Sequence, residues 1–280
     1  MPHLCSRDFI RPLLLLVLAF AVSACSRSGS EERRTLVLTG SSTVAPLASE
    51  IGKRFESLHP GVRIDVQTGG SSRGINDARQ GLAGLGMVSR ALGEKEKDLK
   101  AYTVARDGVA LIVHGDNPIN SLSDTEVVSI YQGKIGNWKT VGGMDAAITV
   151  VNKAEGRSTL ELFLHYFKMK NSEVRPHVVI GDNEQGIKTV STTKNAIAYV
   201  SIGAAEYAVT HGLPIKLLPI AGIPATLATV AEGTFPISRP LNFVSLSEPK
   251  GLAKEFIDFA RSEAVHDIVR SQYFVPITEQ

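Results

Sequence analysis

The feature that most limits the possible folds is a recurring unit: an apolar strand, a loop rich in glycine and hydroxyl residues, and a helix. An apolar segment at 35–38 leads into Gly-Ser-Ser-Thr at 40–43 and a helical pattern over 45–58. Alternating Val62, Ile64 and Val66 lead into Gly-Gly-Ser-Ser-Arg-Gly at 69–74, a helix over about 75–80 and a third strand at 84–88. This alternation predicts an α/β fold with a largely parallel sheet.

The same alternation continues along the chain. Ser123 and Glu126 have the spacing of a capping box and predict a helix start. The loop Gly-Arg-Ser-Thr at 156–159 precedes an amphipathic helix, and a last helix is expected over about 251–270. Further buried strands are expected at 109–113, 148–151, 196–200 and 243–246. With 280 residues, 43% of them hydrophobic, the chain can form one large or two medium domains.

The N-terminus has the pattern of a processing signal. Arg7 and Arg11 accompany an apolar run at 12–22, which is too short to span a bilayer as a mature helix. The run ends in Val-Ser-Ala-Cys, which resembles a bacterial lipoprotein box, and the alternative is an ordinary secretory signal cut near Ala24. We therefore expect a signal peptide at 1–24, lipidation of Cys25, a flexible tether at 25–34 and a periplasmic or cell-envelope location. Cys5 would be removed, so the mature body has no disulfide and no reactive thiol.

The three polar loops share one physical property. Helix N-termini carry unpaired N–H groups and partial positive charge, and therefore bind anions. A single such loop is more often a simple cap, because serine and threonine are preferred there. Three of them at strand ends, where α/β sheets form their ligand crevice, predict one shared anion site. Arg73, Arg90, Lys153 and Arg157 can supply its positive charge, although each can also be a solvated surface residue.

Other functions have weaker support. Residues 70–74 fit a Gly-x-Ser-x-Gly nucleophile motif with Ser72 at its centre. A hydrolase also needs a histidine base and a carboxylate, yet His59 lies in a helix-ending turn, and His165 and His266 lie in helical patterns. The chain has no nucleotide-binding P-loop and no clustered metal ligands. Its formal net charge of +2 does not indicate nucleic-acid binding. We therefore expect that the protein is not an enzyme and has no metal site. Hydrolysis by Ser72 is the alternative.

Six motifs occur in order along the chain: TGSSTVAP at 39–46, GGSSRGI at 69–75, MVSRAL at 87–92, DGVALIV at 107–113, EGRST at 155–159 and PISRPL at 236–241. With these motifs, the chain resembles over residues 35–277 the phosphate-binding proteins of bacterial ABC phosphate importers, in the type II periplasmic binding protein superfamily. That resemblance implies two α/β lobes, 35–111 with 243–280 and 112–242, joined by two crossing hinge strands near 109–113 and 239–244, with a ligand cleft between them.

The resemblance also implies a function. The protein would capture inorganic phosphate in the cleft and deliver it to an ABC permease, as a monomer without a cofactor. Matched position by position, the expected phosphate contacts are Ser42, Thr43, Ser71, Ser72, Ser89, Arg90, Lys153, Arg157, Ser158 and Thr159.

Four positions depart from the family pattern. Lys153 stands at a usual arginine, Arg157 at a usual serine and Ser158 at a usual glycine. Lysine does not give the bidentate fork of arginine, which Arg157 can supply instead. Arg90 stands where some members have an aspartate that accepts the proton of hydrogen phosphate, and Asp107 or a backbone carbonyl can replace that acceptor. Open alternatives are another tetrahedral oxyanion, a sensory role, or an anchored adhesion protein that has lost its ligand.

Overall fold

The computed structural model describes residues 34–277. The expected signal peptide, Cys25 and all but the last residue of the expected tether lie outside the described residues. Within 34–277, no helix is both long enough and apolar enough to cross a membrane.

The first part of the fold is a small parallel sheet covered by helices. β1 (Arg34–Gly40) lies between β2 (Val62–Thr68) and β3 (Leu85–Val88), and both neighbours run parallel to it. α2 (Ala45–Leu58) and α3 (Ser71–Gln80) connect these strands. The chain returns to this part at its end with α9 (Gly251–Ala260) and α10 (His266–Ser271).

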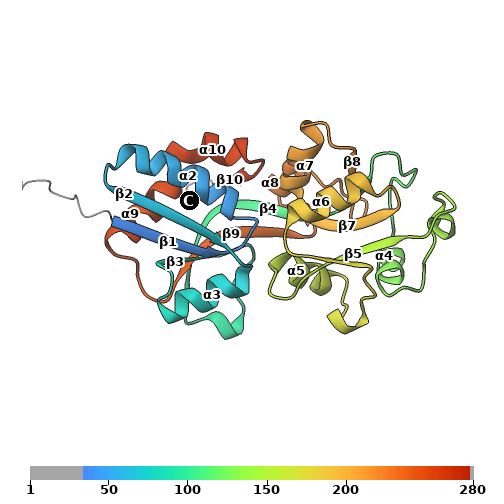
Figure 1. Cartoon of the computed structure of the whole chain (residues 1–280), viewed down its shortest axis with the longest axis horizontal. Coiled ribbons are helices and arrows are strands. Elements are labelled where there is room, and N and C mark those ends of the chain that lie inside the picture. The colour runs from blue at the N-terminus through green and yellow to red at the C-terminus, as the bar shows by residue number, and fades with distance from the viewer. Residues whose placement is uncertain (1–33, 278–280) are drawn as a thin grey trace, which may run out of the picture. The chain divides into compact units, whose positions relative to one another are not determined.

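Two long strands connect this sheet to the rest of the fold (Figure 1). β4 (Lys100–His114) pairs antiparallel with β9 (Ser238–Ser245) along its first half. Its second half pairs with β7 (Ala196–Ser201) and β8 (Ile215–Leu218), and β10 (Val275–Pro276) adds a short pairing at Ala105 and Arg106.

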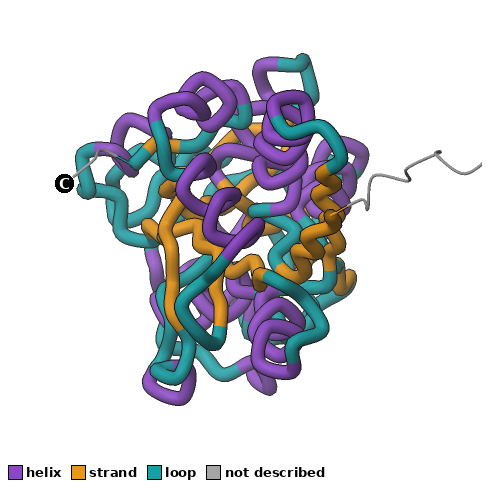
Figure 2. Tube along the Cα trace, turned by 90° about the vertical axis from the view of Figure 1, so that its left-hand side faces the viewer, coloured by secondary structure: helices purple, strands orange, loops and turns teal. Residues whose placement is uncertain are grey.

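The second part repeats the α/β arrangement. β5 (Thr149–Lys153) lies between β7 and β6 (Val178–Ile180) and is parallel to both. Seen along its long axis, the molecule has helices around much of its strand layer (Figure 2). The helices of the second part are α4 (Asp124–Tyr131), α5 (Ser158–Tyr166), α6 (Asn183–Thr192), α7 (Ile202–Thr210) and α8 (Leu227–Ala231).

Each part has its own hydrophobic core, so the protein has the two-lobed α/β fold expected from the sequence. In β4, Val104 and Ala105 pack in the first lobe, whereas Val109 packs in the second. In β9, Leu241 packs in the first lobe, and Ile237, just before the strand, packs in the second. Along each of these two strands, the chain therefore passes from the core of one lobe to the core of the other within three or four residues.

The helices agree with the expectations from the sequence except at three places. Ser123 and Glu126 form the expected capping box of α4. Leu58 continues the apolar spacing of Leu47, Ile51 and Phe55 in α2 but is 60% exposed, because the helix ends there. α3 begins at Ser71, because Gly70 takes φ +94° and turns the chain directly into the helix. The expected long C-terminal helix is two α-helices with a short 3-10 helix, Glu263–Val265, between them, because Ser262 is extended and its hydroxyl donates to the Phe259 carbonyl.

Candidate anion-binding site

One small cavity lies where four helices begin. α2, α3 and α5 start beside it, and α6 starts directly after its lining residue Gly181. The space between its lining atoms is about 210 Å³, including open solvent, so the cavity suits a small ligand. Four helix N-termini favour negative charge. The lining residues are Ser41, Ser42, Thr43, Gly70, Ser71, Ser89, Lys153, Arg157, Ser158, Thr159 and Gly181.

The glycines of the 69–74 loop allow close backbone approach. A Cβ at Gly70 would lie 2.7 Å from the Gly156 carbonyl oxygen in the second lobe. A Cβ at Gly74 would lie 2.7 Å from the Thr39 carbonyl oxygen, where α3 packs on β1. These two contacts account for both glycines of the Gly-x-Ser-x-Gly pattern without a nucleophile.

A buried ion pair lies behind the cavity. Asp107 on β4 and Arg239 on β9 are register partners, and both side chains are fully buried. Nη2 and Nε of Arg239 lie 2.7 and 3.0 Å from Oδ2 of Asp107. The other carboxylate oxygen accepts from the amide of Gly203 at 3.2 Å. The pair thus joins the two strands at the place where the chain passes between the lobes.

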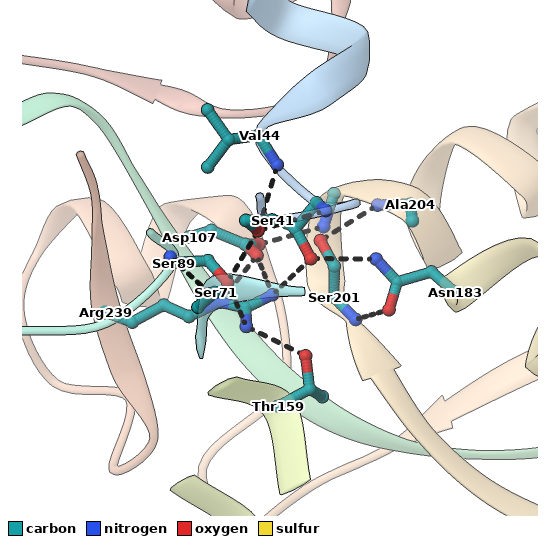
Figure 3. Close-up of polar contacts among 12 residues, drawn as sticks. Ser41, Val44, Ser71, Ser89, Asp107, Thr159, Asn183, Ser201, Ala204 and Arg239 are labelled. Carbon is teal, nitrogen blue, oxygen red and sulfur yellow. Dashed lines mark hydrogen bonds and ion pairs between the residues drawn. The ribbon is translucent and has the colours of Figure 1, made fainter. Parts of the chain in front are cut away.

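Arg239 also holds three hydroxyls that line the cavity (Figure 3). Nη1 donates to Oγ1 of Thr159 at 3.0 Å and to Oγ of Ser89 at 3.5 Å. Nη2 donates to Oγ1 of Thr43 at 3.4 Å. Thr159 belongs to the second lobe and the other two to the first, so one guanidinium connects hydroxyls from both sides.

Lys153 is a buried cation at the end of β5. Its Nζ donates to Oδ1 of Asn183 at 2.9 Å, and its amide donates to the hydroxyl of Tyr199 at 3.2 Å. Burial, followed by the positive charges of Arg239 and Arg157, lowers the pKa of Lys153 to about 7, with Asp182 opposing the shift. An anion in the cavity would favour the charged form of this lysine.

Arg157 lines the cavity and lies between the two lobes. It precedes the first residue of α5, and among residues 34–277 no carboxylate forms an ion pair with it. Its side chain lies against Gly70 of the first lobe and Gly181 of the second, where Cβ atoms would come within 2.9 and 3.3 Å of it. The guanidinium is thus available to a ligand.

Eight of the ten expected contact residues line this cavity, and two do not. Ser72 instead lies against Gly156 of the second lobe, and its amide donates to the Gly156 carbonyl at 3.2 Å. Arg90, expected to face the anion, instead binds Glu96 at 2.7 and 2.8 Å and pairs with Glu161 of α5 at 2.5 Å. Two carboxylates draw its guanidinium away from the cavity.

Arg73, whose role the sequence left open, also lies outside the cavity lining. It is exposed and bonds to Asp77, to Gln67 and to the Thr68 carbonyl within its own lobe.

The geometry does not support hydrolysis at Ser72. Its hydroxyl makes no hydrogen bond to a histidine in the described part of the chain. His59, His114, His177 and His211 instead bond main-chain groups near them. Residues 34–277 also contain no group of three or more potential metal ligands.

The sequence reasoning missed three residues of the site. Ser41 accepts from the amides of Thr43 and Val44 and donates to Ser89, so it organises the first loop. Asn183 connects Lys153 to Thr43. Arg239 lies within the sequence motif at 236–241. Its position between the apolar residues Ile237 and Leu241 was the signal that could have identified it as a buried arginine.

Comparison with known proteins gives consistent matches. Residues 26–264 match the family model described as a PBP superfamily domain. The phosphate-binding protein PstS of Bacillus subtilis is 29% identical, over 95% of this chain and 94% of the relative. A phosphate ABC transporter substrate-binding protein of Clostridium perfringens, solved with bound phosphate, is 32% identical with a TM-score of 0.80, over 88% of this chain and 100% of that one. An ABC-type phosphate transport receptor of Vibrio cholerae is 28% identical with a TM-score of 0.72, over 86% of this chain and 100% of that one.

Asp107→Ala should destabilise the protein by about 3–5 kcal/mol, because Arg239 is left charged and unpaired in the interior. Urea unfolding of the ligand-free protein measures this. Asp98→Ala, which breaks the exposed pair with Arg79, is the control and should change stability little. The double variant Asp107→Leu, Arg239→Met should recover part of the loss. Equal unfolding midpoints for Asp107→Ala and Asp98→Ala would contradict the assigned role of the pair.

Proposed function

The chain belongs to the PBP superfamily, and we propose that its cavity captures inorganic phosphate outside the cytoplasm for delivery to an ABC importer. The observation that carries this proposal is the composition of the cavity. Four helix N-termini, Lys153, Arg157 and several hydroxyls meet there, and none of the described lining residues is a carboxylate. A small oxyanion with many acceptor oxygens matches such a set of donors. Bound phosphate in the Clostridium perfringens structure supports the same ligand class.

Binding is coupled to closure of the two lobes, which we place at 35–111 with 243–280 and at 112–242. The cavity takes hydroxyls from both lobes, so a ligand that bonds both favours the closed arrangement. The permease then recognises the closed form, in which the cavity holds its ligand. The contacts between Ser72 and Gly156 and between Arg90 and Glu161 cross from one lobe to the other and add to the closed form.

The location follows from the N-terminal pattern. Residues 1–24 act as a signal peptide, Cys25 receives lipid, and the tether at 25–34 leaves the binding lobes in the periplasm or at the cell envelope, where the protein works as a monomer.

The purified unlipidated protein should bind phosphate with a dissociation constant of about 1 μM or below by calorimetry. Arg157→Ala should weaken binding roughly 10- to 150-fold, the range for a hydrogen bond to a charged group. Arg73→Ala removes the same charge outside the cavity and should leave affinity unchanged. Arsenate, sulfate and molybdate are titrated in parallel. Tight sulfate binding without phosphate binding would assign the protein to another oxyanion.

Phosphate binding should take up a proton through Lys153. In the ligand-free protein its pKa is lowered to about 7, so at about pH 8 most molecules carry the neutral amine. The bound anion raises this pKa, and affinity therefore falls as pH rises above about 7. Calorimetry in two buffers of different ionisation enthalpy counts the protons taken up at a pH where free phosphate is already mostly dianionic. Lys153→Met should abolish the uptake, and equal proton uptake by the two proteins would refute this assignment.

Cys25→Ser should release the protein from the membrane. In cells expressing the full chain, a clickable fatty acid should label the wild type and should not label the variant, which moves to the soluble fraction. Phosphate binding by the variant should be normal, because the cavity residues lie within 41–181. Labelling of Cys25→Ser at the wild-type level would contradict lipidation at this residue.

A further inference from the structure

The direction of the hydrogen bonds around Thr43 is fixed by its neighbours. Oδ1 of Asn183 accepts from Nζ of Lys153 at 2.9 Å and from the amide of Ser201 at 3.3 Å, so the amide nitrogen of Asn183 points the other way. That nitrogen donates to Oγ1 of Thr43 at 3.1 Å, and Arg239 donates to the same oxygen at 3.4 Å. Both lone pairs of the threonine oxygen are therefore used, and its hydroxyl can only donate to a ligand.

Ser89 is restricted in the same way. Oγ of Ser41 accepts from two amides, at 3.2 and 3.3 Å, and so donates its own hydrogen to Oγ of Ser89 at 2.9 Å. The Ser89 oxygen also accepts from Arg239 at 3.5 Å. Its hydroxyl is left to donate to the cavity.

The remaining polar groups of the lining add mostly donors. Oγ1 of Thr159 accepts from Arg239, and Oγ of Ser71 accepts from the amide of Ser89, so each keeps its hydrogen and one lone pair for a ligand. Arg157 has no acceptor, and Lys153 has none once an anion holds it in its charged form. Asp107 is not among the lining residues, and both its oxygens already accept from the protein. A ligand that itself carries a proton needs an acceptor in this cavity.

Ser158 differs from Thr159 and Ser71, because no group in the described part of the chain bonds its hydroxyl at all. It is 2% exposed, and its Oγ has no hydrogen-bond partner among residues 34–277. Both its lone pairs and its hydrogen are therefore unused. A buried hydroxyl without a partner destabilises its surroundings, and a ligand group that bonds it removes that cost. The Ser42 hydroxyl also makes no hydrogen bond within residues 34–277, but it is only half-buried, so water can satisfy it.

We propose that Oγ of Ser158 accepts the hydrogen bond from the protonated oxygen of bound hydrogen phosphate, and so determines that this donor-rich cavity admits a protonated oxyanion. The inference rests on the proposed function. The four oxygens of the anion accept hydrogen bonds from donors in the loops of both lobes. The single P–O–H hydrogen is donated to Oγ of Ser158. The serine thereby supplies the acceptor that the arginines, Lys153, Thr43 and Ser89 do not offer.

Monofluorophosphate tests this directly, because it is a dianion of nearly the same shape in which fluorine replaces the hydroxyl. The wild type should bind hydrogen phosphate roughly tenfold or more tightly than monofluorophosphate near pH 7. Ser158→Ala and Ser158→Gly should lower the affinity for phosphate by about the same factor, with little effect on monofluorophosphate, so the preference disappears. Ser42→Ala is the matched control and should weaken both anions equally.

Three results would overturn the inference. If Ser158→Ala lowers the affinity for both anions by the same factor, the serine contacts the ligand without accepting from its hydroxyl. If it weakens neither, the serine does not touch the ligand. If the wild type binds neither anion, the proposed function fails first, and the inference fails with it. Circular dichroism of each variant at the titration temperature confirms that the fold is intact.

Discussion

The arrangement of the binding cavity depends on one buried ion pair. Asp107 and Arg239 lie opposite each other on the two strands that pass between the lobes, and neither side chain is exposed to solvent. A charge buried alone costs several kcal/mol, so each residue requires the other. Because Asp107 occupies one side of the guanidinium, the other side is left to Thr43, Ser89 and Thr159. The ion pair thus sets where these hydroxyls lie and which way they point.

This arrangement explains how a protein with a formal net charge of only +2 can favour an anion locally. The positive charge of Arg239 is balanced by Asp107, and the net cations of the lining are Lys153 and Arg157. Helix N-termini and hydroxyls supply the rest as dipoles, which bring no counter-charge into the interior. A cavity built in this way is polar and small, and it contrasts with the apolar pockets that hold organic ligands.

Much of the fold and a large share of the cavity could be predicted from sequence. The alternation of apolar strands with Gly-Ser-Thr loops is a local pattern, and the first five elements followed it closely. Ser71 and Thr159 belong to such Gly-Ser-Thr segments at helix starts, and Lys153 ends the strand before one, so the local pattern identified all three. Arg90 was misplaced because two carboxylates hold its guanidinium: Glu96, six residues away, and Glu161, whose pairing depends on how the lobes meet. Arg239 was missed for the related reason that its role comes from a neighbour 132 residues away.

The position of the ion pair has a mechanical consequence. Asp107 and Arg239 are a register pair of β4 and β9, and the chain changes hydrophobic core on either side of them. In the proposed closure of the lobes, this fully buried pair therefore lies on the strands about which the lobes would turn, behind the cavity. Around such a pivot the cavity has a short lever arm, whereas the outer ends of the lobes have long ones. A small movement at the hydroxyls would then become a large displacement at the rim of the lobes.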